Sequence, residues 1–360
     1  MSSSKGVDHV TPAHRIVPYN DIWLDCVNNN LMAILISHHS SFEKLPLTFK
    51  TQYWKKLINQ TFPEDNFESL LQQGLMLPKI QYDTEQLYHY LRFEDQLIEQ
   101  SDIPFLDEMI QGALDKQKYV FLDVDRFFYS SGREAGKIHF IHPTFIHGKS
   151  ASGEAYTVIE DCLSPGRMHD YLTPLEVIME STQYLITSGR KVRFIMVSVH
   201  EGSIRNFNHD FSVQDSFISE LRSNLLDDKV VFLEQYGLHY QLGLKALTDY
   251  VEEFEELVGN LNETSIFALR SSSFAQNHKK NNRLFKLLED KSAHTNLYKQ
   301  LAEQSMELSR LWEIYRTTVI KMMASNNRVY NQAFVKLEEI VKKEYHMVQT
   351  MKMATEVSNS

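Results

Sequence analysis

Residues 137–162, "KIHFIHPTFIHGKSASGEAYTVIEDC", decide the fold. Two runs rich in β-branched and aromatic residues flank a Gly/Ser segment around residues 150–153. This pattern is typical of two antiparallel strands joined by a hairpin loop. We therefore expect His142, near the start of the first run, and Asp161, at the end of the second, to lie at the same end of neighbouring strands.

The segments on either side of the hairpin extend the predicted sheet. Residues 118–130, "KYVFLDVDRFFYS", and 191–200, "KVRFIMVSVH", are rich in apolar β-formers and predict two further strands. Between them, "LSPGRMHDYLTPLEVIMES" predicts a loop and a helix that Thr173 caps, with Pro174 in its first turn.

The two ends of the chain have a helical pattern. Residues 40–118 read as mostly helical, and after about residue 213 strand signals vanish in favour of amphipathic helices. The segregation of helices and strands predicts an α+β fold, with a domain at 1–212 and an α-helical module at 213–360. The heptad-like leucines of that module predict an intramolecular helical bundle, with a homodimer seam as the alternative.

Bulk composition excludes several classes of protein. The 360 residues carry a net charge of −10, which argues against nucleic-acid binding because phosphate neutralisation needs clustered Lys and Arg. Two cysteines cannot form a disulfide framework. The sequence has no signal-peptide pattern and no apolar run long enough to cross a membrane. We therefore expect a cytoplasmic protein without a membrane partner.

Cys26 lies where a polar turn becomes an apolar run, in "PYNDIWLDCVNNNLMAILISHH", residues 18–39. Apolar residues at helical spacing predict a helix over 26–38, with Asp25 as its N-cap. The positive end of a helix dipole favours the thiolate, which is the nucleophilic form of cysteine. The alternative is that Cys26 is a buried, unreactive thiol.

A cysteine nucleophile needs a general base, a group that orients the base, and donors for the oxyanion. The predicted hairpin supplies His142 as base and Asp161 as the orienting carboxylate. Asn20, six residues before Cys26, is the candidate oxyanion donor. Cys162 is expected to have a structural role. Along a strand, His139 and His142 point to opposite faces, and so do His142 and His147. No Cys or carboxylate lies at the spacing that would complete a tetrahedral set of metal ligands, so we expect no metal site.

The order of these motifs resembles a known group of proteins. A Cys, then H-x5-G at His142, then a strand ending in "VIED", is similar to the papain-like bacteriocin-processing cysteine peptidases. A closer resemblance is to the family named for the butirosin biosynthesis protein H amino-terminal domain, carried by "LDVDRFFYSSGREAGKIHFIHPTFIHG" and "YGLHYQLGLKALTDYVEEF". The resemblance covers residues 15 to about 350. Asn20 stands where the peptidases have Gln.

This resemblance implies a papain-like fold and an acyltransferase of specialised (antibiotic or peptide-type) biosynthesis. An acyl group would pass from a carrier-protein thioester through Cys26 to an amine or hydroxyl of a small-molecule or peptidyl acceptor. Phosphopantetheine would enter only as part of the carrier protein, and no other cofactor is implied. Substrate contacts are expected at His147, which replaces a usually apolar residue, and at Tyr129.

Two alternatives to the acyltransferase remain open at this point. A thiol peptidase or amide hydrolase would use the same fold and the same residues. A non-catalytic scaffold would bind a pathway partner and leave Cys26 unreactive. If a carrier protein is the partner, its acidic surface needs a basic counterpart, for which residues 188–193 and 277–286 are candidates.

Overall fold

The computed structural model describes residues 15–57, 64–205, 207, 215–234, 238–290, 295–325 and 330–357. The chain is a mixed α+β protein with two antiparallel sheets and a C-terminal helical region, as the sequence predicts. The described residues form two compact units. The first unit lies within residues 1–20, 25–43 and 86–207, and the second lies within residues 21–24, 44–85 and 208–360. Residues 44–85 therefore belong with the C-terminal helices, whereas the sequence suggested one boundary near 212.

The first unit is built on a six-stranded antiparallel sheet in the order β3-β8-β4-β5-β6-β7. Its strands are β3 (Leu91–Ile98), β4 (Tyr119–Asp125), β5 (Ile141–Lys149), β6 (Ala155–Glu160), β7 (His169–Pro174) and β8 (Val192–Val199). Its helices are α1 (Cys26–His38), α3 (Glu85–Tyr88, whose first residue belongs to the second unit), α4 (Leu106–Asp115), α5 (Leu175–Thr187) and α6 (Glu201–Arg205), with short 3₁₀ helices η2 (Ile103–Phe105) and η3 (Arg126–Phe128).

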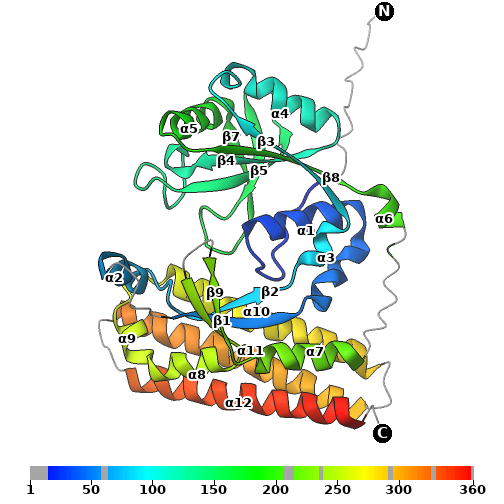
Figure 1. Ribbon diagram of the computed structural model, residues 1–360, viewed down its shortest axis with the longest axis vertical. Helices are drawn as coiled ribbons and strands as arrows, with labels where there is room; N and C mark the ends of the chain where they lie inside the picture. The colour runs from blue at the N-terminus through cyan, green and yellow to red at the C-terminus, as the bar shows by residue number, and fades with distance from the viewer. Residues whose placement is uncertain are drawn as a thin grey trace, which may run out of the picture. The chain divides into compact units, whose positions relative to one another are not determined.

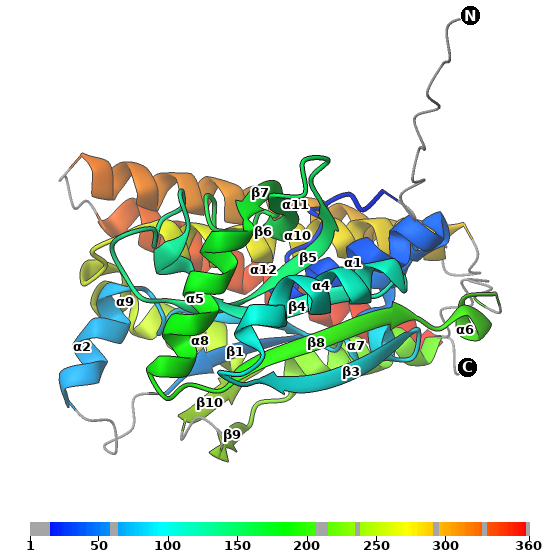
Figure 2. The ribbon, with the colours of Figure 1, turned by 90° about the horizontal axis from the view of Figure 1, so that it is seen from above.

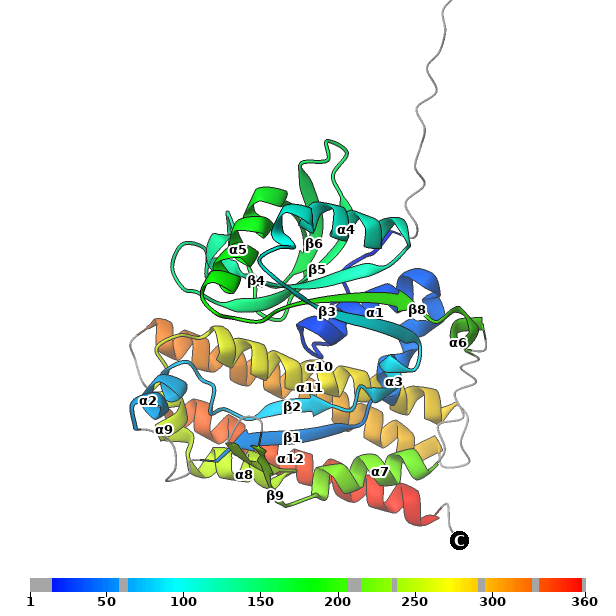
Figure 3. The ribbon, with the colours of Figure 1, turned by 45° about the horizontal axis from the view of Figure 1, so that its top comes forward.

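Helices cover both faces of this sheet, which explains why every residue of β4 is buried. Figure 1 and Figure 3 show α4 and α5 above the sheet and α1 below it. Val120, Leu122 and Val124 of β4 pack in one cluster with Ile110 of α4 and Ile178 of α5. A strand buried on both sides reads as a continuous apolar run, which is the pattern of "YVFLDV".

The predicted hairpin is confirmed as β5 and β6, which pair antiparallel. The register shifts between Ile146 and Gly148, so His147 is the extra residue of a β-bulge. Beyond the bulge, Phe145 lies opposite Ile159. A bulge of one residue reverses the face to which every later side chain points, and this decides which carboxylate meets His142.

The second unit combines a four-stranded antiparallel sheet, in the order β2-β1-β10-β9, with long helices. Its strands are β1 (Thr51–Lys56), β2 (Lys79–Tyr82), β9 (Val230–Leu233) and β10 (Leu238–Leu242). Its helices are α2 (Glu64–Gln72), α7 (Asp215–Leu226), α8 (Lys245–Glu252), α9 (Phe254–Gly259), α10 (Ser265–Glu289), α11 (Thr295–Ala324) and α12 (Tyr330–Val357). The 3₁₀ helix η1 (Ser40–Thr48) joins the two units along the chain.

The helices α10, α11 and α12 pack against one another within the chain (Figure 2). Their interior contains a polar network around the fully buried Glu344. The carboxylate accepts hydrogen bonds from Tyr53 Oη at 3.0 Å and from Trp312 Nε1 at 3.3 Å, and His278 Nε2 lies 2.7 Å away. A buried carboxylate is tolerated when hydrogen bonds surround it in this way.

Three predictions about secondary structure are wrong. Residues 40–118 include the strands β1, β2 and β3, and strands also occur after residue 213, as β9 and β10. Thr173 does not cap a helix, because it lies in β7, and α5 begins after Pro174 without a side-chain cap. The missed strands have four to eight residues each, so periodicity had little length in which to distinguish them from helices.

Among the described residues, no helix has both the length and the apolar character needed to cross a membrane.

Candidate active site

Cys26 is the first residue of α1, as the capping pattern predicts. Asp25 caps the helix, because its Oδ1 accepts a hydrogen bond from the backbone N–H of Asn28 at 2.7 Å. The side chain of Asn28 also donates to Asp25, at 2.6 Å, which fixes the cap. Cys26 is partly exposed, so its thiol is positioned at the helix N-terminus and reachable from solvent.

The thiol of Cys26 is hydrogen-bonded to the imidazole of His142. His142 is the second residue of β5, opposite Val124 of β4, and is only 8% exposed. The sheet therefore holds the ring against the start of α1. The two residues lie 116 positions apart in sequence and are brought together by the fold, as the motif order suggests.

Glu160 is the carboxylate that contacts the imidazole. Its Oε2 lies 3.2 Å from His142 Nδ1, and its side chain is fully buried. Burial alone would lower the pKa of His142, but the charge of Glu160, followed by the hydrogen bonds to Cys26 and Glu160, raises that pKa well above its usual value. The ring is therefore an imidazolium at neutral pH.

Four groups compensate for the burial of Glu160. Burial would raise its pKa, but His142, Arg126 and the hydroxyl of Thr144 lower it well below its usual value. Tyr129 Oη lies 3.2 Å from Oε1 of Glu160 and 3.0 Å from Thr144 Oγ1. Because cations and hydrogen-bond donors surround it, the carboxylate stays ionised without solvent.

Arg126 is the centre of the polar cluster, although no sequence motif marks it. Its Nη2 forms ion pairs with Glu160 and, at 2.7 Å, with Asp161 Oδ1, and it lies 2.9 Å from His142 Nδ1. The two carboxylates raise the pKa of the guanidinium above its usual value despite its burial. The guanidinium is thus shared by two neighbouring carboxylates, and His142 is the second cation beside Glu160.

The β-bulge at His147 explains why Glu160 takes the place expected for Asp161. Continuing the observed register by one pair puts Glu160 opposite Thr144, which shares a face with His142. Without the extra residue, the pairing of Gly148 with Thr157 would continue to Thr144 opposite Asp161. The bulge therefore turns Glu160, and not Asp161, toward the imidazole.

Asp161 remains near the site and binds different groups. Its Oδ1 pairs with Arg126 and its Oδ2 accepts from the backbone N–H of Gly166 at 3.3 Å. Asn20 is held by the backbone of Met168: its Nδ2 donates to the carbonyl at 2.9 Å and its Oδ1 accepts from the N–H at 2.8 Å. The Asn20 amide keeps one N–H that these bonds do not use.

The remaining predicted residues lie around this cluster. Tyr129 is buried, and its contact with Glu160 makes it part of the support for that carboxylate. The ring of His147 stacks on Phe145, and its Nε2 lies 3.1 Å from Asp170 Oδ1. Cys162 is buried, and burial raises the pKa of its thiol, as expected for a structural cysteine.

His142, Glu160 and Asp161 also form a set of three side chains whose donor atoms lie within 4.8 Å of one another. Such a set is able to hold a metal ion in principle. Here the guanidinium of Arg126 already lies between the three donors, at 2.9 Å from His142 Nδ1 and 2.7 Å from Asp161. The protonated imidazole of His142 has no lone pair to offer a metal ion, and the guanidinium already pairs with both carboxylates, so these donors fit a metal poorly.

No protein-family model matches this sequence, and no curated protein has a matching sequence.

One of the two basic segments considered for partner docking is largely inside the second unit. In residues 277–286, Asn277, His278 and Lys280 are buried in α10. Lys280 Nζ donates to the carbonyl of Phe49 at 2.7 Å, and burial lowers its pKa to about 7. The other three basic residues of this segment, Lys279, Arg283 and Lys286, are exposed, and Arg283 pairs with Asp21. In residues 188–193, Arg193 is half-exposed and pairs with Asp123.

Proposed function

We propose that the protein is a cysteine-dependent acyltransferase with a papain-like core, in which Cys26 is the nucleophile and His142 the general acid and base. The hydrogen bond between Cys26, at the start of α1, and His142, on β5, carries the proposal. A helix that begins with cysteine and an antiparallel sheet that supplies histidine are the two parts such a core requires. Glu160 orients the ring, and Arg126, Tyr129 and Thr144 keep Glu160 ionised.

The proposed reaction proceeds through an acyl-enzyme. The thiolate of Cys26 attacks the carbonyl carbon of a thioester, and the bond between that carbon and the leaving sulfur breaks. The leaving thiolate takes the proton of the His142 imidazolium. The neutral imidazole then removes a proton from an amine or hydroxyl, whose attack releases Cys26 as thiolate beside the restored imidazolium. Thioester exchange costs little free energy, so the chemistry needs no cofactor of its own.

Two groups supply oxyanion donors in this proposal. The first N–H groups of a helix have no acceptor within the helix, and Cys26 is the first residue of α1. Its own N–H is therefore available beside the reacting sulfur. Asn20 contributes the amide hydrogen that its bonds to Met168 leave free. Both donors would stabilise the negative oxygen of a tetrahedral intermediate.

The resemblance to the butirosin biosynthesis protein H family supports the finer part of the proposal. It favours a carrier-protein thioester as acyl donor, an amine or hydroxyl acceptor, and a specialised biosynthetic pathway. A free, reactive thiol also suits a reducing compartment, so we place the proposed enzyme in the cytoplasm.

Acyl transfer is tested by intact mass spectrometry. Wild-type protein and the variants Cys26→Ala and Cys162→Ala are incubated with acyl N-acetylcysteamine thioesters, and a primary amine is then added. We expect a single acyl adduct on wild type and Cys162→Ala, none on Cys26→Ala, and faster loss of the adduct when the amine is present. An adduct that persists in Cys26→Ala contradicts the proposal. Loss of the adduct at the same rate with and without amine identifies a hydrolase instead.

A further inference from the structure

A pocket of about 280 Å³ lies in the second unit, on one face of its four-stranded sheet. Trp54 and Lys56 are two residues apart on β1, with Lys79 of β2 opposite Trp54 and Tyr240 of β10 opposite Lys56. These four side chains therefore point to the same face. The pocket is lined by Trp54, Lys56, Leu75, Leu77, Lys79, Leu238, Tyr240 and Arg270.

The lining is positively charged and contains no carboxylate. Three of the eight side chains are cations, and none is Asp or Glu. Burial, followed by the charge of Arg270, lowers the pKa of Lys56. The two cations are therefore close enough to repel each other in a partly desolvated environment. Such an arrangement costs free energy in the empty protein and is relieved by an anion.

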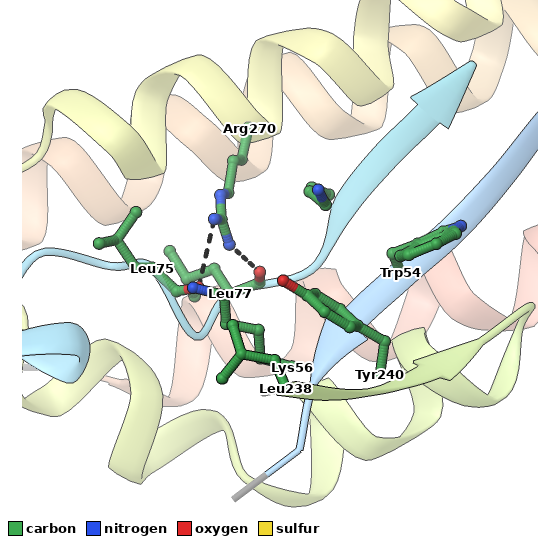
Figure 4. Close-up of a pocket in the computed structure, with 8 residues that line it drawn as sticks. Trp54, Lys56, Leu75, Leu77, Leu238, Tyr240 and Arg270 are labelled. Atoms are coloured by element: carbon green, nitrogen blue, oxygen red, sulfur yellow. Dashed lines mark hydrogen bonds between the residues drawn. The ribbon is translucent and has the colours of Figure 1, made fainter. Parts of the chain in front are cut away.

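Arg270 is fixed from the helix side of the pocket. It extends from α10, and its Nη2 donates to the carbonyl of Leu75 at 3.2 Å while its Nη1 donates to the carbonyl of Leu77 (Figure 4). A guanidinium has five N–H groups, so these two bonds hold its position and leave others for a ligand. Fixed donors bind an anion without a large loss of side-chain entropy.

The remaining lining offers apolar and aromatic surface. Leu75, Leu77 and Leu238 form the apolar part. Lys79 Nζ lies 5.6 Å from the ring centres of both Trp54 and Tyr240, which holds the ammonium group beside the pocket. A ligand that matches this lining has one compact anionic group and a small apolar body.

We propose that this pocket binds a small phosphate monoester, whose anion contacts Lys56, Lys79 and Arg270 and whose apolar body packs against the three leucines. A dianion suits three cations better than a monoanion does. The residues of the pocket belong to the second unit and Cys26 belongs to the first, so the binding proposal does not depend on the proposed acyl transfer.

Isothermal titration of the full chain with phenyl phosphate tests this proposal, with benzoate and inorganic phosphate as comparison ligands. We compare wild type with Lys56→Gln and with the control Lys299→Gln, which removes the same charge from an exposed position on α11. Arg270 is left unchanged because it also holds the backbone of Leu75 and Leu77.

We expect saturable binding of phenyl phosphate that weakens about tenfold or more in Lys56→Gln and is unchanged in Lys299→Gln, since a hydrogen bond to a charged group contributes a factor of at least about ten. Benzoate and inorganic phosphate should bind more weakly than phenyl phosphate. The proposal is overturned by non-saturable binding, by equal weakening in both variants, or by tighter binding of benzoate.

Discussion

The imidazole of His142 and the carboxylate of Glu160 face each other inside the first unit, with Nδ1 3.2 Å from Oε2. Their contact depends on the β-bulge at His147, which sets the register between β5 and β6. The charge of each group compensates for the desolvation of the other. Arg126 is a second cation paired with the same carboxylate. The pair thereby holds the ring that is hydrogen-bonded to Cys26.

Glu160→Gln and Asp161→Asn distinguish the two candidate orienting carboxylates. Glu160→Gln removes the charge that does most to raise the pKa of His142, whereas Asp161→Asn removes a partner of Arg126. We expect Glu160→Gln to lower the alkylation rate of Cys26 by about tenfold or more, since one pKa unit of His142 is a factor of ten. Asp161→Asn should reduce it by less. Equal losses in the two variants would mean that Glu160 has no special role.

Arg126→Met tests how much the buried cation stabilises the first unit. Its removal leaves Glu160 and Asp161 buried without their shared counter-charge, so we expect a loss of about 3–5 kcal/mol of unfolding free energy. Arg283→Met is the control, because Arg283 also pairs with a carboxylate, that of Asp21, and both side chains of this pair are exposed. An exposed pair contributes about 0–1 kcal/mol. Denaturant titration of both variants measures the difference, and similar losses would contradict this account.

The pH dependence of stability reports the raised pKa of His142. A group whose pKa is higher in the folded state contributes stability that is fully present below its unfolded pKa, near 6.5, and is lost as the pH rises through the folded value. The stability advantage of wild type over His142→Gln should therefore be greater at pH 6 than at pH 9. Chemical unfolding at the two pH values measures it, and an advantage that grows with pH would reverse the predicted sign.

Lys280 gives a pH dependence in the second unit with the opposite slope. Burial lowers its pKa to about 7, so the unfolded chain binds more protons than the folded one between about pH 7 and the ordinary lysine value near 10.5. Stability from this residue therefore rises with pH, by about 1 kcal/mol for each pH unit just above 7. The variant Lys280→Met lacks the hydrogen bond to Phe49 at every pH. It also lacks the titrating amine, so its stability should not show this rise with pH.

The measurement for Lys280 is the difference in unfolding free energy between Lys280→Met and wild type at pH 6 and pH 8. The free energy of unfolding of Lys280→Met, relative to that of wild type, should be higher at pH 6 than at pH 8, because wild type must bury a charged ammonium group at pH 6. Lys279→Met, at the exposed neighbouring position, is the control and should show no such change. A difference that does not vary with pH would mean that Lys280 keeps its charge in the folded protein.

The elements predicted from long, regular patterns match the structure well. The helix over 26–38 and its Asp25 cap are confirmed, because the cap residue and the apolar spacing act locally. The strands at Tyr119–Asp125 and Val192–Val199 are also confirmed. The short strands of the second unit were not predicted, since their pairing partners lie up to about 190 residues apart and leave no local periodic signal.

The candidate site was predictable only in part. Cys26 and His142 follow from a helix start and a hairpin, both of which are local patterns. Glu160 required knowledge of the bulge at His147, because a shift of one residue exchanges the faces of Glu160 and Asp161. Arg126 has no motif at all. It is identified only when the fold brings Glu160, Asp161 and His142 around one guanidinium.

The reactivity of Cys26 tests the central claim most directly. Wild type and His142→Ala are exposed to limiting iodoacetamide at mildly acidic pH, and intact mass with peptide mapping measures the rate at each cysteine. Cys162, which is buried, serves as the internal comparison. The Cys26–His142 pair predicts fast modification of Cys26 alone and a large fall in that rate in His142→Ala. If Cys26 reacts no faster than Cys162 or than a free thiol, it is not an activated nucleophile and the acyltransferase proposal fails.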